Sequence, residues 1–109
     1  MPKIEFLYFA DCPSHDRALA LLRQALTEEG LNPAAVTIIE IKTEAEAEEY
    51  QFYGSPTIRV NGLDIAPLPP DISEPGLSCR GYQKADGRIS PLPPLELMVQ
   101  ALRKANAVQ

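Results

Sequence analysis

A chain of 109 residues is long enough for one domain with a single packed core. Its 45% hydrophobic and 23% charged residues are typical of a globular protein rather than a disordered one. Proteins that bind nucleic acid or anionic membranes usually carry an excess of Lys and Arg that contacts phosphate groups. This chain has a formal net charge of −5, so we expect neither nucleic acid nor an anionic membrane as a partner.

The N-terminal ten residues do not have the pattern of a secretory signal. Glu5 interrupts their apolar run, Lys3 is the one cation before it, and Asp11-Cys12 follows where a signal would carry small residues. No stretch of the sequence approaches the ~18 apolar residues of a membrane span. We therefore predict a cytoplasmic protein, in which two cysteines are more often reduced, reactive or buried than joined in a permanent disulfide.

The first half of the chain alternates between strand and helix patterns. Ile4 to Phe9 is predicted to be a strand, and its near-continuous hydrophobicity indicates a central strand covered on both faces. Pro13 suits the first position of a helix, and Gly30 marks its end. The apolar positions between them recur at helical spacing: Ala18, Leu19, Leu22, Ala25 and Leu26. Val36 to Ile41, rich in β-branched residues, is predicted to be the second strand.

A second helix and a strand hairpin follow. Thr43 with Glu46 forms a capping box that opens the helix. Thr57 to Val60 and Leu63 to Ile65 are predicted strands. Asn61-Gly62 joins them and is typical of a type I′ turn, so the two strands should form an antiparallel pair.

Residues 66–92 are interpreted as an insertion before a last helix. Four prolines predict an irregular loop over residues 66 to 80, and loops of that length are often functional. Asp86-Gly87 is a further turn signal. Pro93-Pro94 opens the last helix, whose buried stripe is predicted to be Leu95, Met98, Val99 and Leu102.

Cys12-Pro13-Ser14-His15 stands at the junction of the first strand and the first helix. It is half of a dithiol motif, with a cysteine where C-x-x-C begins and a histidine in place of the second cysteine. The N–H groups and the dipole at a helix N-terminus favour a thiolate, which is the nucleophilic form. Cys12 is therefore a candidate nucleophile. The alternative is a small apolar residue packed under the sheet edge, and the negative charge of Asp11 opposes thiolate formation.

These features resemble the thioredoxin-like superfamily over most of the chain. The resemblance rests on the strand that ends in Asp11-Cys12-Pro13, the helix after it, Gly54-Ser55-Pro56 before the Asn61-Gly62 hairpin, and a final helix. It implies an α/β fold of the thioredoxin-like class, with a central mixed β-sheet in the order β-α-β-α-β-β-α, flanked by helices. The single domain would cover residues 1–109, with the proline-rich insertion before the last helix.

Within this resemblance, Cys12 matches the nucleophilic cysteine and Pro56 the cis proline that faces it. His15 falls where the second cysteine would stand, so the chain looks more like a small glutaredoxin-like group than thioredoxin itself. A cis bend would leave the Ser55 backbone beside the thiol, where it can pair with an extended peptide or with glutathione as an added strand does. Pro13, Ser55 and Pro56 are thus expected to contact substrate. The alternative for Pro56 is an ordinary trans turn.

His15 is the only histidine and lies about one helical turn from Cys12. As imidazolium it can pair with the thiolate, and as neutral imidazole it can accept the thiol proton; the alternative is a solvated first-turn residue. Cys12, His15 and Cys79 are the side chains that a metal site would use, but they fall short of the four ligands of tetrahedral zinc. We therefore expect no resident metal and no cofactor, with glutathione as a candidate co-substrate.

Cys79 and Arg80 follow the proline-rich loop. Cys79 is a candidate resolving cysteine that attacks a mixed disulfide on Cys12, in place of the missing motif partner. The alternative is a loop cysteine that anchors the insertion by its small apolar side chain, since a disulfide requires Cα atoms within ~7 Å. Arg80 can lower a thiol pKa or bind a substrate carboxylate, and the alternative is an ordinary exposed arginine.

Together these residues predict a thiol–disulfide oxidoreductase-like protein that acts on protein thiols and disulfides or on glutathione. The catalytic candidates are Cys12, His15 and Cys79, and the substrate-binding candidates are Pro13, Ser55, Pro56 and Arg80. Two alternatives stay open. One is a non-catalytic thioredoxin-fold binding module with an inert thiol, and the other is a thiol-based protein that captures metal or organometal ions.

Overall fold

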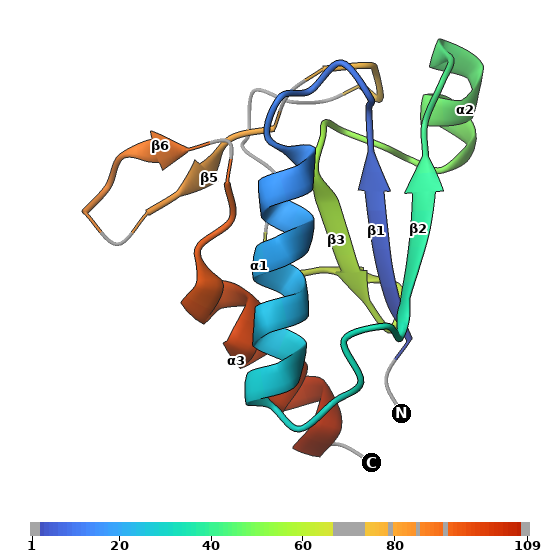
Figure 1. Ribbon diagram of the computed structural model, residues 1–109. Coiled ribbons are helices and arrows are strands. Elements are labelled where there is room, and N and C mark those ends of the chain that lie inside the picture. Colours follow the sequence, from blue (N-terminus) through green and yellow to red (C-terminus); the bar gives the residue numbers. More distant parts are fainter. Residues whose placement is uncertain (1–2, 67–73, 79, 85, 91, 108–109) are drawn as a thin grey trace.

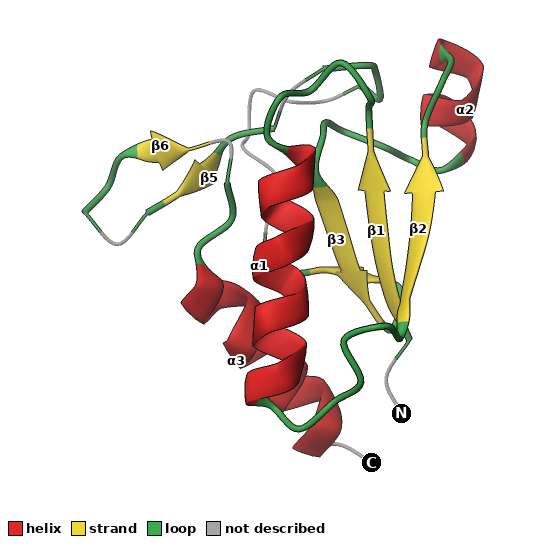
Figure 2. Ribbon diagram, in the orientation of Figure 1, coloured by secondary structure: helices red, strands yellow, loops and turns green. Residues whose placement is uncertain are grey.

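The computed structural model describes residues 3–66, 74–78, 80–84, 86–90 and 92–107 (Figure 1). Helices and strands alternate along the first half of the chain, and a small hairpin precedes the last helix (Figure 2). The elements are β1 (Ile4–Tyr8), α1 (His15–Glu28), β2 (Val36–Glu40), α2 (Glu44–Glu49), β3 (Thr57–Val60), β4 (Leu63–Asp64), β5 (Tyr82–Gln83), β6 (Ile89–Ser90) and α3 (Leu95–Ala107).

The main sheet has the strand order β2-β1-β3-β4. β1 pairs in parallel with β2 and antiparallel with β3, and β4 pairs antiparallel with β3. β1 is therefore a central strand, as its hydrophobicity predicts. A four-stranded mixed sheet flanked by helices in the order β-α-β-α-β-β is a thioredoxin-like arrangement, so the expected fold class is confirmed.

The core lies between the sheet and the helices α1 and α3, which pack against each other. Side chains on a strand alternate between faces, so Ile4 and Phe6 of β1 and Ile58 and Val60 of β3 share the face that meets these helices. Ala18, Leu22, Ala25 and Leu26 of α1 and Met98 and Leu102 of α3 complete this cluster. A smaller cluster on the other side joins Leu7 to Ile41, Ala47 and Phe52.

The predicted turn residues have the backbone that their chemistry favours. Gly30 has φ +73° and ends α1, with its N–H bonded to the Thr27 carbonyl and the Leu31 N–H bonded to the Leu26 carbonyl. This pair of bonds is a Schellman motif. Asn61 and Gly62 both have positive φ, 54° and 82°, as a type I′ hairpin turn requires.

The capping box at α2 is confirmed in part. The Glu46 N–H donates to Thr43 Oγ1 at 3.1 Å, as predicted. The return bond differs, because Glu46 Oε1 accepts from the Lys42 N–H at 3.0 Å rather than from the Thr43 N–H. Both bonds still satisfy N–H groups around the start of a short helix.

Two expectations differ from the structure. α1 begins at His15 with Ser14 as its N-cap, so Pro13 lies in the turn before the helix rather than at its first position. The insertion also contains the β5–β6 hairpin, which projects to one side of the molecule in Figure 1, where we expected only a turn at Asp86-Gly87. Strands of two residues are too short to produce a period-two signal in the sequence.

The predicted turn itself is present. The Gly87 N–H donates to the Lys84 carbonyl, and Gly87 has φ +88°. Among the described residues no helix is both long enough and apolar enough to cross a membrane.

Candidate functional site

Cys12 lies in the turn between β1 and α1, near the carboxyl end of the central strand (Figure 1). Its N–H donates to the Phe9 carbonyl at 2.9 Å, which closes this turn. The residue is a free cysteine that is only 1% exposed. Its Sγ donates a hydrogen bond to the Ser55 carbonyl at 3.5 Å, so the thiol faces the loop before β3.

The Ser55–Pro56 peptide bond is cis, as the resemblance implies. The side chain of Ser55 ties this loop to the cysteine turn, because its Oγ accepts from the Phe9 N–H at 3.0 Å. Thr57 Oγ1 in turn donates to the Gly54 carbonyl at 2.6 Å. The thiol and the proline loop are therefore held together by side-chain contacts from both segments.

The backbone of Ser55 is already paired with the insertion. The Ser55 N–H donates to the Ser78 carbonyl at 2.8 Å, and the Arg80 N–H donates to the Ser55 carbonyl at 2.9 Å. Both backbone groups of Ser55, its N–H and its carbonyl, therefore bond to the insertion. The backbone groups that we expected to receive a substrate are thus occupied by the chain itself.

Gly54 allows this close approach. It has φ +132°, a conformation that residues with a Cβ rarely adopt. A Cβ at this position would also lie 3.0 Å from the Cβ of Arg80 and 3.2 Å from its backbone nitrogen. Both the conformation and the space at Gly54 therefore favour glycine.

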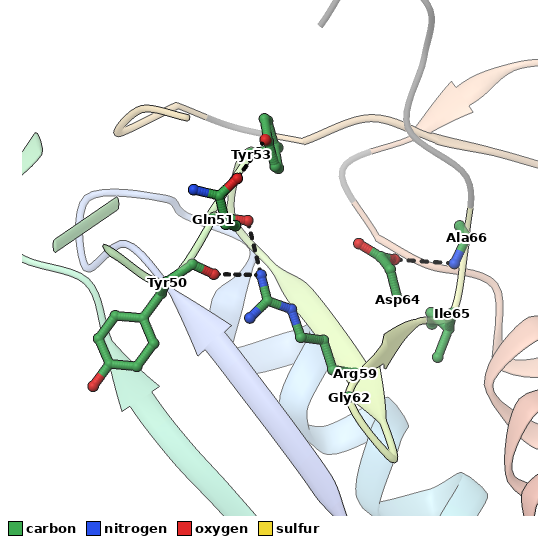
Figure 3. Close-up of a pocket in the computed structure, with 8 residues that line it drawn as sticks. All are labelled: Tyr50, Gln51, Tyr53, Arg59, Gly62, Asp64, Ile65 and Ala66. Atoms are coloured by element: carbon green, nitrogen blue, oxygen red, sulfur yellow. Dashed lines mark hydrogen bonds between the residues drawn. The ribbon is translucent and has the colours of Figure 1, made fainter. Parts of the chain in front are cut away.

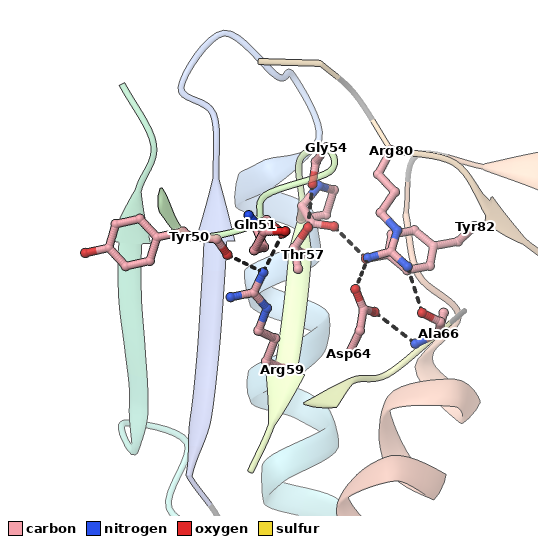
Figure 4. Close-up of polar contacts among 10 residues, drawn as sticks. Tyr50, Gln51, Gly54, Thr57, Arg59, Asp64, Ala66, Arg80 and Tyr82 are labelled. Atoms are coloured by element: carbon pink, nitrogen blue, oxygen red, sulfur yellow. Dashed lines mark hydrogen bonds and ion pairs between the residues drawn. The ribbon is translucent and has the colours of Figure 1, made fainter. Parts of the chain in front are cut away.

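The Arg80 side chain is buried, which excludes the alternative of an ordinary exposed arginine. Its Nη1 forms an ion pair with Asp64 Oδ2, and its Nη2 donates to the Ala66 carbonyl at 2.9 Å (Figure 4). The guanidinium also lies over the Tyr82 ring, with Cζ 4.8 Å from the ring centroid. Arg80 Nε is the one buried side-chain polar atom without a hydrogen-bond partner among the described residues.

Tyr82 extends the same network toward the proline loop. Its hydroxyl donates to the Pro56 carbonyl. Burial raises the pKa of Tyr82 well above its ordinary value; the nearby Arg80 lowers it and Asp64 raises it, both to a smaller extent. The phenol is therefore held neutral, in the form that can donate to Pro56.

His15 belongs to a different cluster. Its ring stacks on the Tyr8 ring, with centroids 4.6 Å apart and an interplanar angle of 25°. Its Nδ1 lies 3.3 Å from Asp16 Oδ1. Burial and the neighbouring Glu40 carboxylate raise the pKa of Tyr8, whose hydroxyl donates to Glu40 at 3.5 Å. Within the described chain no hydrogen bond joins the His15 ring to Cys12.

The structure thus brings four of the seven predicted site residues together: Cys12, Ser55, Pro56 and Arg80. His15 is directed to Tyr8 and Asp16, and Pro13 is exposed in the turn before α1. Cys79 lies outside the described residues. Sequence reasoning missed Asp64 and Tyr82, because neither carries a local motif and both join the site only through long-range contacts.

A surface cleft of about 610 Å³ lies on another part of the molecule (Figure 3). Its lining consists of Tyr50, Gln51, Tyr53, Arg59, Gly62, Asp64, Ile65 and Ala66. Arg59 Nη2 donates to the carbonyls of Tyr50 and Gln51 at 2.7 and 2.8 Å, which satisfies acceptors just after α2. Cys12 does not line this cleft, which meets the thiol site only through Asp64 and Ala66, the two partners of the Arg80 guanidinium.

In the part of the chain that the structure describes, no group of three or more His, Cys, Asp and Glu side chains is arranged to hold a metal ion. The site consists of a buried thiol that bonds to the Ser55 carbonyl, beside a backbone edge that the insertion occupies, at the end of a thioredoxin-like sheet. Comparisons of the chain with models of protein families, with curated proteins and with solved structures gave no match.

Proposed function

We propose that the protein is a thiol–disulfide oxidoreductase-like protein in which Cys12 is the nucleophile. The observation that carries this proposal is the position of the Cys12 sulfur, 3.5 Å from the carbonyl of Ser55, the residue before the cis proline. A substrate backbone that pairs with Ser55 as an added strand would bring its own sulfur close to this thiol.

The reaction that we propose is exchange. Cys12 loses its proton, and the thiolate attacks one sulfur of a protein disulfide or of glutathione disulfide. A new S–S bond to Cys12 forms as the old S–S bond breaks. The other sulfur leaves as a thiolate and takes up a proton, so one half of the substrate disulfide is released as a thiol while the other half stays bonded to Cys12.

Resolution of the mixed disulfide needs a second thiol, and the motif lacks one. We propose one of two routes. Cys79 attacks the Cys12 sulfur, which forms a Cys12–Cys79 disulfide, releases the substrate thiol and leaves the disulfide to be reduced by two glutathione thiols, or a glutathione thiol attacks the substrate sulfur, which frees Cys12 and forms a glutathione–substrate disulfide. Cys79 follows Ser78 and precedes Arg80 in the sequence, and both of these neighbours bond to Ser55. This sequence neighbourhood is the reason to test Cys79 before any external thiol.

The test is exchange with glutathione disulfide, followed by mass spectrometry of the intact protein. Cys12→Ser should abolish exchange, and Cys79→Ser is the matched control that retains the nucleophile. If Cys79 resolves, Cys79→Ser accumulates a glutathione adduct on Cys12 that the native chain clears. Exchange that survives Cys12→Ser would show that the nucleophile is assigned wrongly.

One observation favours a second candidate, the non-catalytic binding module. Cys12 is almost completely buried and its thiol acts as a hydrogen-bond donor, which is the behaviour of a structural cysteine. The alkylation rate of Cys12 against pH, resolved by site, separates the two functions. A midpoint well below the ~8.5 of a free thiol supports the oxidoreductase, whereas no alkylation without denaturant supports the binding module.

A further inference from the structure

The insertion lies along the proline loop as a backbone strand would. We call residues 76–78 and 80–82 the strap. Besides the two bonds to Ser55, the strap donates from the Gly76 N–H to the Phe52 carbonyl at 3.0 Å and from the Tyr82 hydroxyl to the Pro56 carbonyl. The strap therefore contacts the loop before, at and after the position that faces the thiol.

The backbone of Ser55 has no bonding capacity left in this arrangement. Its one donor, the N–H, is used by Ser78, and its carbonyl accepts from both the Arg80 N–H and Cys12 Sγ. A carbonyl oxygen has two lone pairs and an amide one hydrogen. Any backbone that docks on Ser55 must therefore replace the strap, because buried donors and acceptors are costly to leave unpaired.

We propose that the strap occupies the site on Ser55 where the substrate backbone would bind, so that the protein without substrate is in a closed state. The Cys12 thiol becomes reactive when the strap dissociates from Ser55. This inference rests on the proposed function for the identity of the substrate, an extended peptide backbone such as that of glutathione. The closed state itself rests only on the contacts between the strap and the loop.

The ion pair between Arg80 and Asp64 holds the strap in the closed state, and we call this pair the latch. Arg80 is the strap residue whose side chain is anchored outside the proline loop, to β4 and to the Ala66 carbonyl (Figure 4). A charge-assisted bond to a buried guanidinium is stronger than a neutral one, so the latch sets how often the strap opens. Removal of the Asp64 charge should favour the open state without change to Cys12, Ser55 or the strap itself.

The experiment compares Asp64→Asn with the native chain, with the alkylation of Cys12 by iodoacetamide as the readout, resolved by mass spectrometry. The amide keeps the size of the side chain and one acceptor but removes the charge. We expect alkylation of Cys12 to become about tenfold faster, since the rate follows the population of the open state when opening is rapid. Glu29→Gln is the matched control, because it removes the charge from the pair that joins Glu29, the C-cap residue of α1, to Arg103 of α3, and no strap residue takes part in that pair; it should leave the rate unchanged.

Hydrogen exchange locates the opening. In Asp64→Asn the amides of Ser55 and Arg80 should exchange faster, while the amides of the β1–β3 ladder keep their native rates. Tyr82→Phe, which removes a single hydroxyl from the strap, is the second variant and should shift the same amides. If Asp64→Asn is folded and neither alkylation nor these amides change, the strap is not a gate and the inference is wrong.

The outcomes also separate this inference from the proposed function. If the latch variant opens the strap but glutathione disulfide still does not react with Cys12, the gate is present and the oxidoreductase assignment fails. If the native chain and Asp64→Asn both exchange with glutathione disulfide, and at the same rate, the function holds and the gate is overturned. S-methylglutathione, which has no free thiol, provides a binding test independent of chemistry, and it should bind the variant more tightly.

Discussion

The core and the strap of this protein are held by different forces. The core between the sheet and the helices α1 and α3 consists of aliphatic and aromatic side chains that exclude water from one another. The strap is held mainly by polar contacts: backbone hydrogen bonds, one phenol hydroxyl, and the ion pair of the buried Arg80 with the partly exposed Asp64. Its one apolar contribution to a core cluster is Leu77, which packs against the smaller cluster. Apolar burial is shared among many neighbours, whereas the ion pair and the phenol bond of the strap can each be removed by one substitution.

Because of this difference, the stability of the fold and the access of reagents to the Cys12 thiol should depend on different contacts. Loss of a few polar contacts can release the strap while the core remains packed, because local openings require less free energy than global unfolding. The Cys12 thiol bonds to the Ser55 carbonyl, which also bonds to the strap, and Cys12 is not part of the main core cluster. Substitutions in the core should therefore change mainly the free energy of unfolding, whereas substitutions in the strap should change mainly the rate at which Cys12 is alkylated.

The largest effect on stability is expected for Leu22→Ala. Leu22 is completely buried in the core cluster, and removal of such a side chain costs about 2–5 kcal/mol of unfolding free energy, because a cavity is left behind. Urea unfolding measures this loss. Alkylation of Cys12 in buffer should change little, since the contacts of the strap are intact.

If a core variant also exposed Cys12 to alkylation, the core and the strap would not control separate properties. If alkylation of Cys12 in Leu22→Ala rises in proportion to the loss of stability, the thiol is exposed only by global unfolding. Leu22→Met provides the control, because it keeps the volume and should cost less than about 1.5 kcal/mol.

The core and its turns could be predicted from the sequence because their signals are local. The spacing of apolar residues predicts α1, the Asn61-Gly62 pair predicts the hairpin, and Gly30 marks the end of the helix. The central position of β1 also followed from its composition alone. In each of these cases, the residues that determine the structure are neighbours in the chain.

The strap could not be predicted because its contacts join distant residues. Arg80 and Asp64 are 16 positions apart, and Tyr82 bonds to a carbonyl 26 positions away. Neither separation has a period or a motif that sequence reasoning can detect. The same limit applies to His15, where helical spacing suggested Cys12 as a partner but the ring stacks on Tyr8 of the preceding strand.

An intermediate effect is expected at alkaline pH, through Tyr82. Burial raises the pKa of Tyr82, so the folded chain keeps this proton at a pH where the unfolded chain, with an ordinary pKa of about 10, has lost it. The folded state then binds more protons than the unfolded state, and stability falls as pH rises above about 10. Urea midpoints at about pH 8 and pH 11 should therefore differ more for the native chain than for Tyr82→Phe.

Tyr8→Phe is the control for this pH dependence. The pKa of Tyr8 is also raised, by burial and then by Glu40, so its removal should lessen the alkaline loss too, but by a smaller amount because the Tyr8 ring is much less enclosed than that of Tyr82. If Tyr8→Phe and Tyr82→Phe lessened it equally, the buried phenol of the strap would not be what makes the protein sensitive to alkali.

The smallest effect on stability is expected for Glu29→Gln. Its urea midpoint, set beside that of Asp64→Asn, compares the Arg103–Glu29 pair with the Arg80–Asp64 pair. Arg103 contacts Glu29 through two nitrogens, at 3.0 and 3.2 Å, so its geometry is as good as that of the Arg80–Asp64 pair. The two pairs differ mainly in the burial of the arginine, since the Arg103 side chain is 67% exposed and that of Arg80 is 1% exposed. The carboxylates differ less, with Glu29 11% and Asp64 27% exposed. Water and salt screen the exposed pair, so the urea midpoint of Glu29→Gln should stay close to the native value, and the small difference should vanish at high salt. Asp64→Asn should keep more of its effect at high salt, because the Arg80 guanidinium is buried and a partly buried pair is screened less. Equal losses in the two variants would mean that burial does not set the strength of the latch, and that the strap is held mainly by its backbone bonds to Ser55.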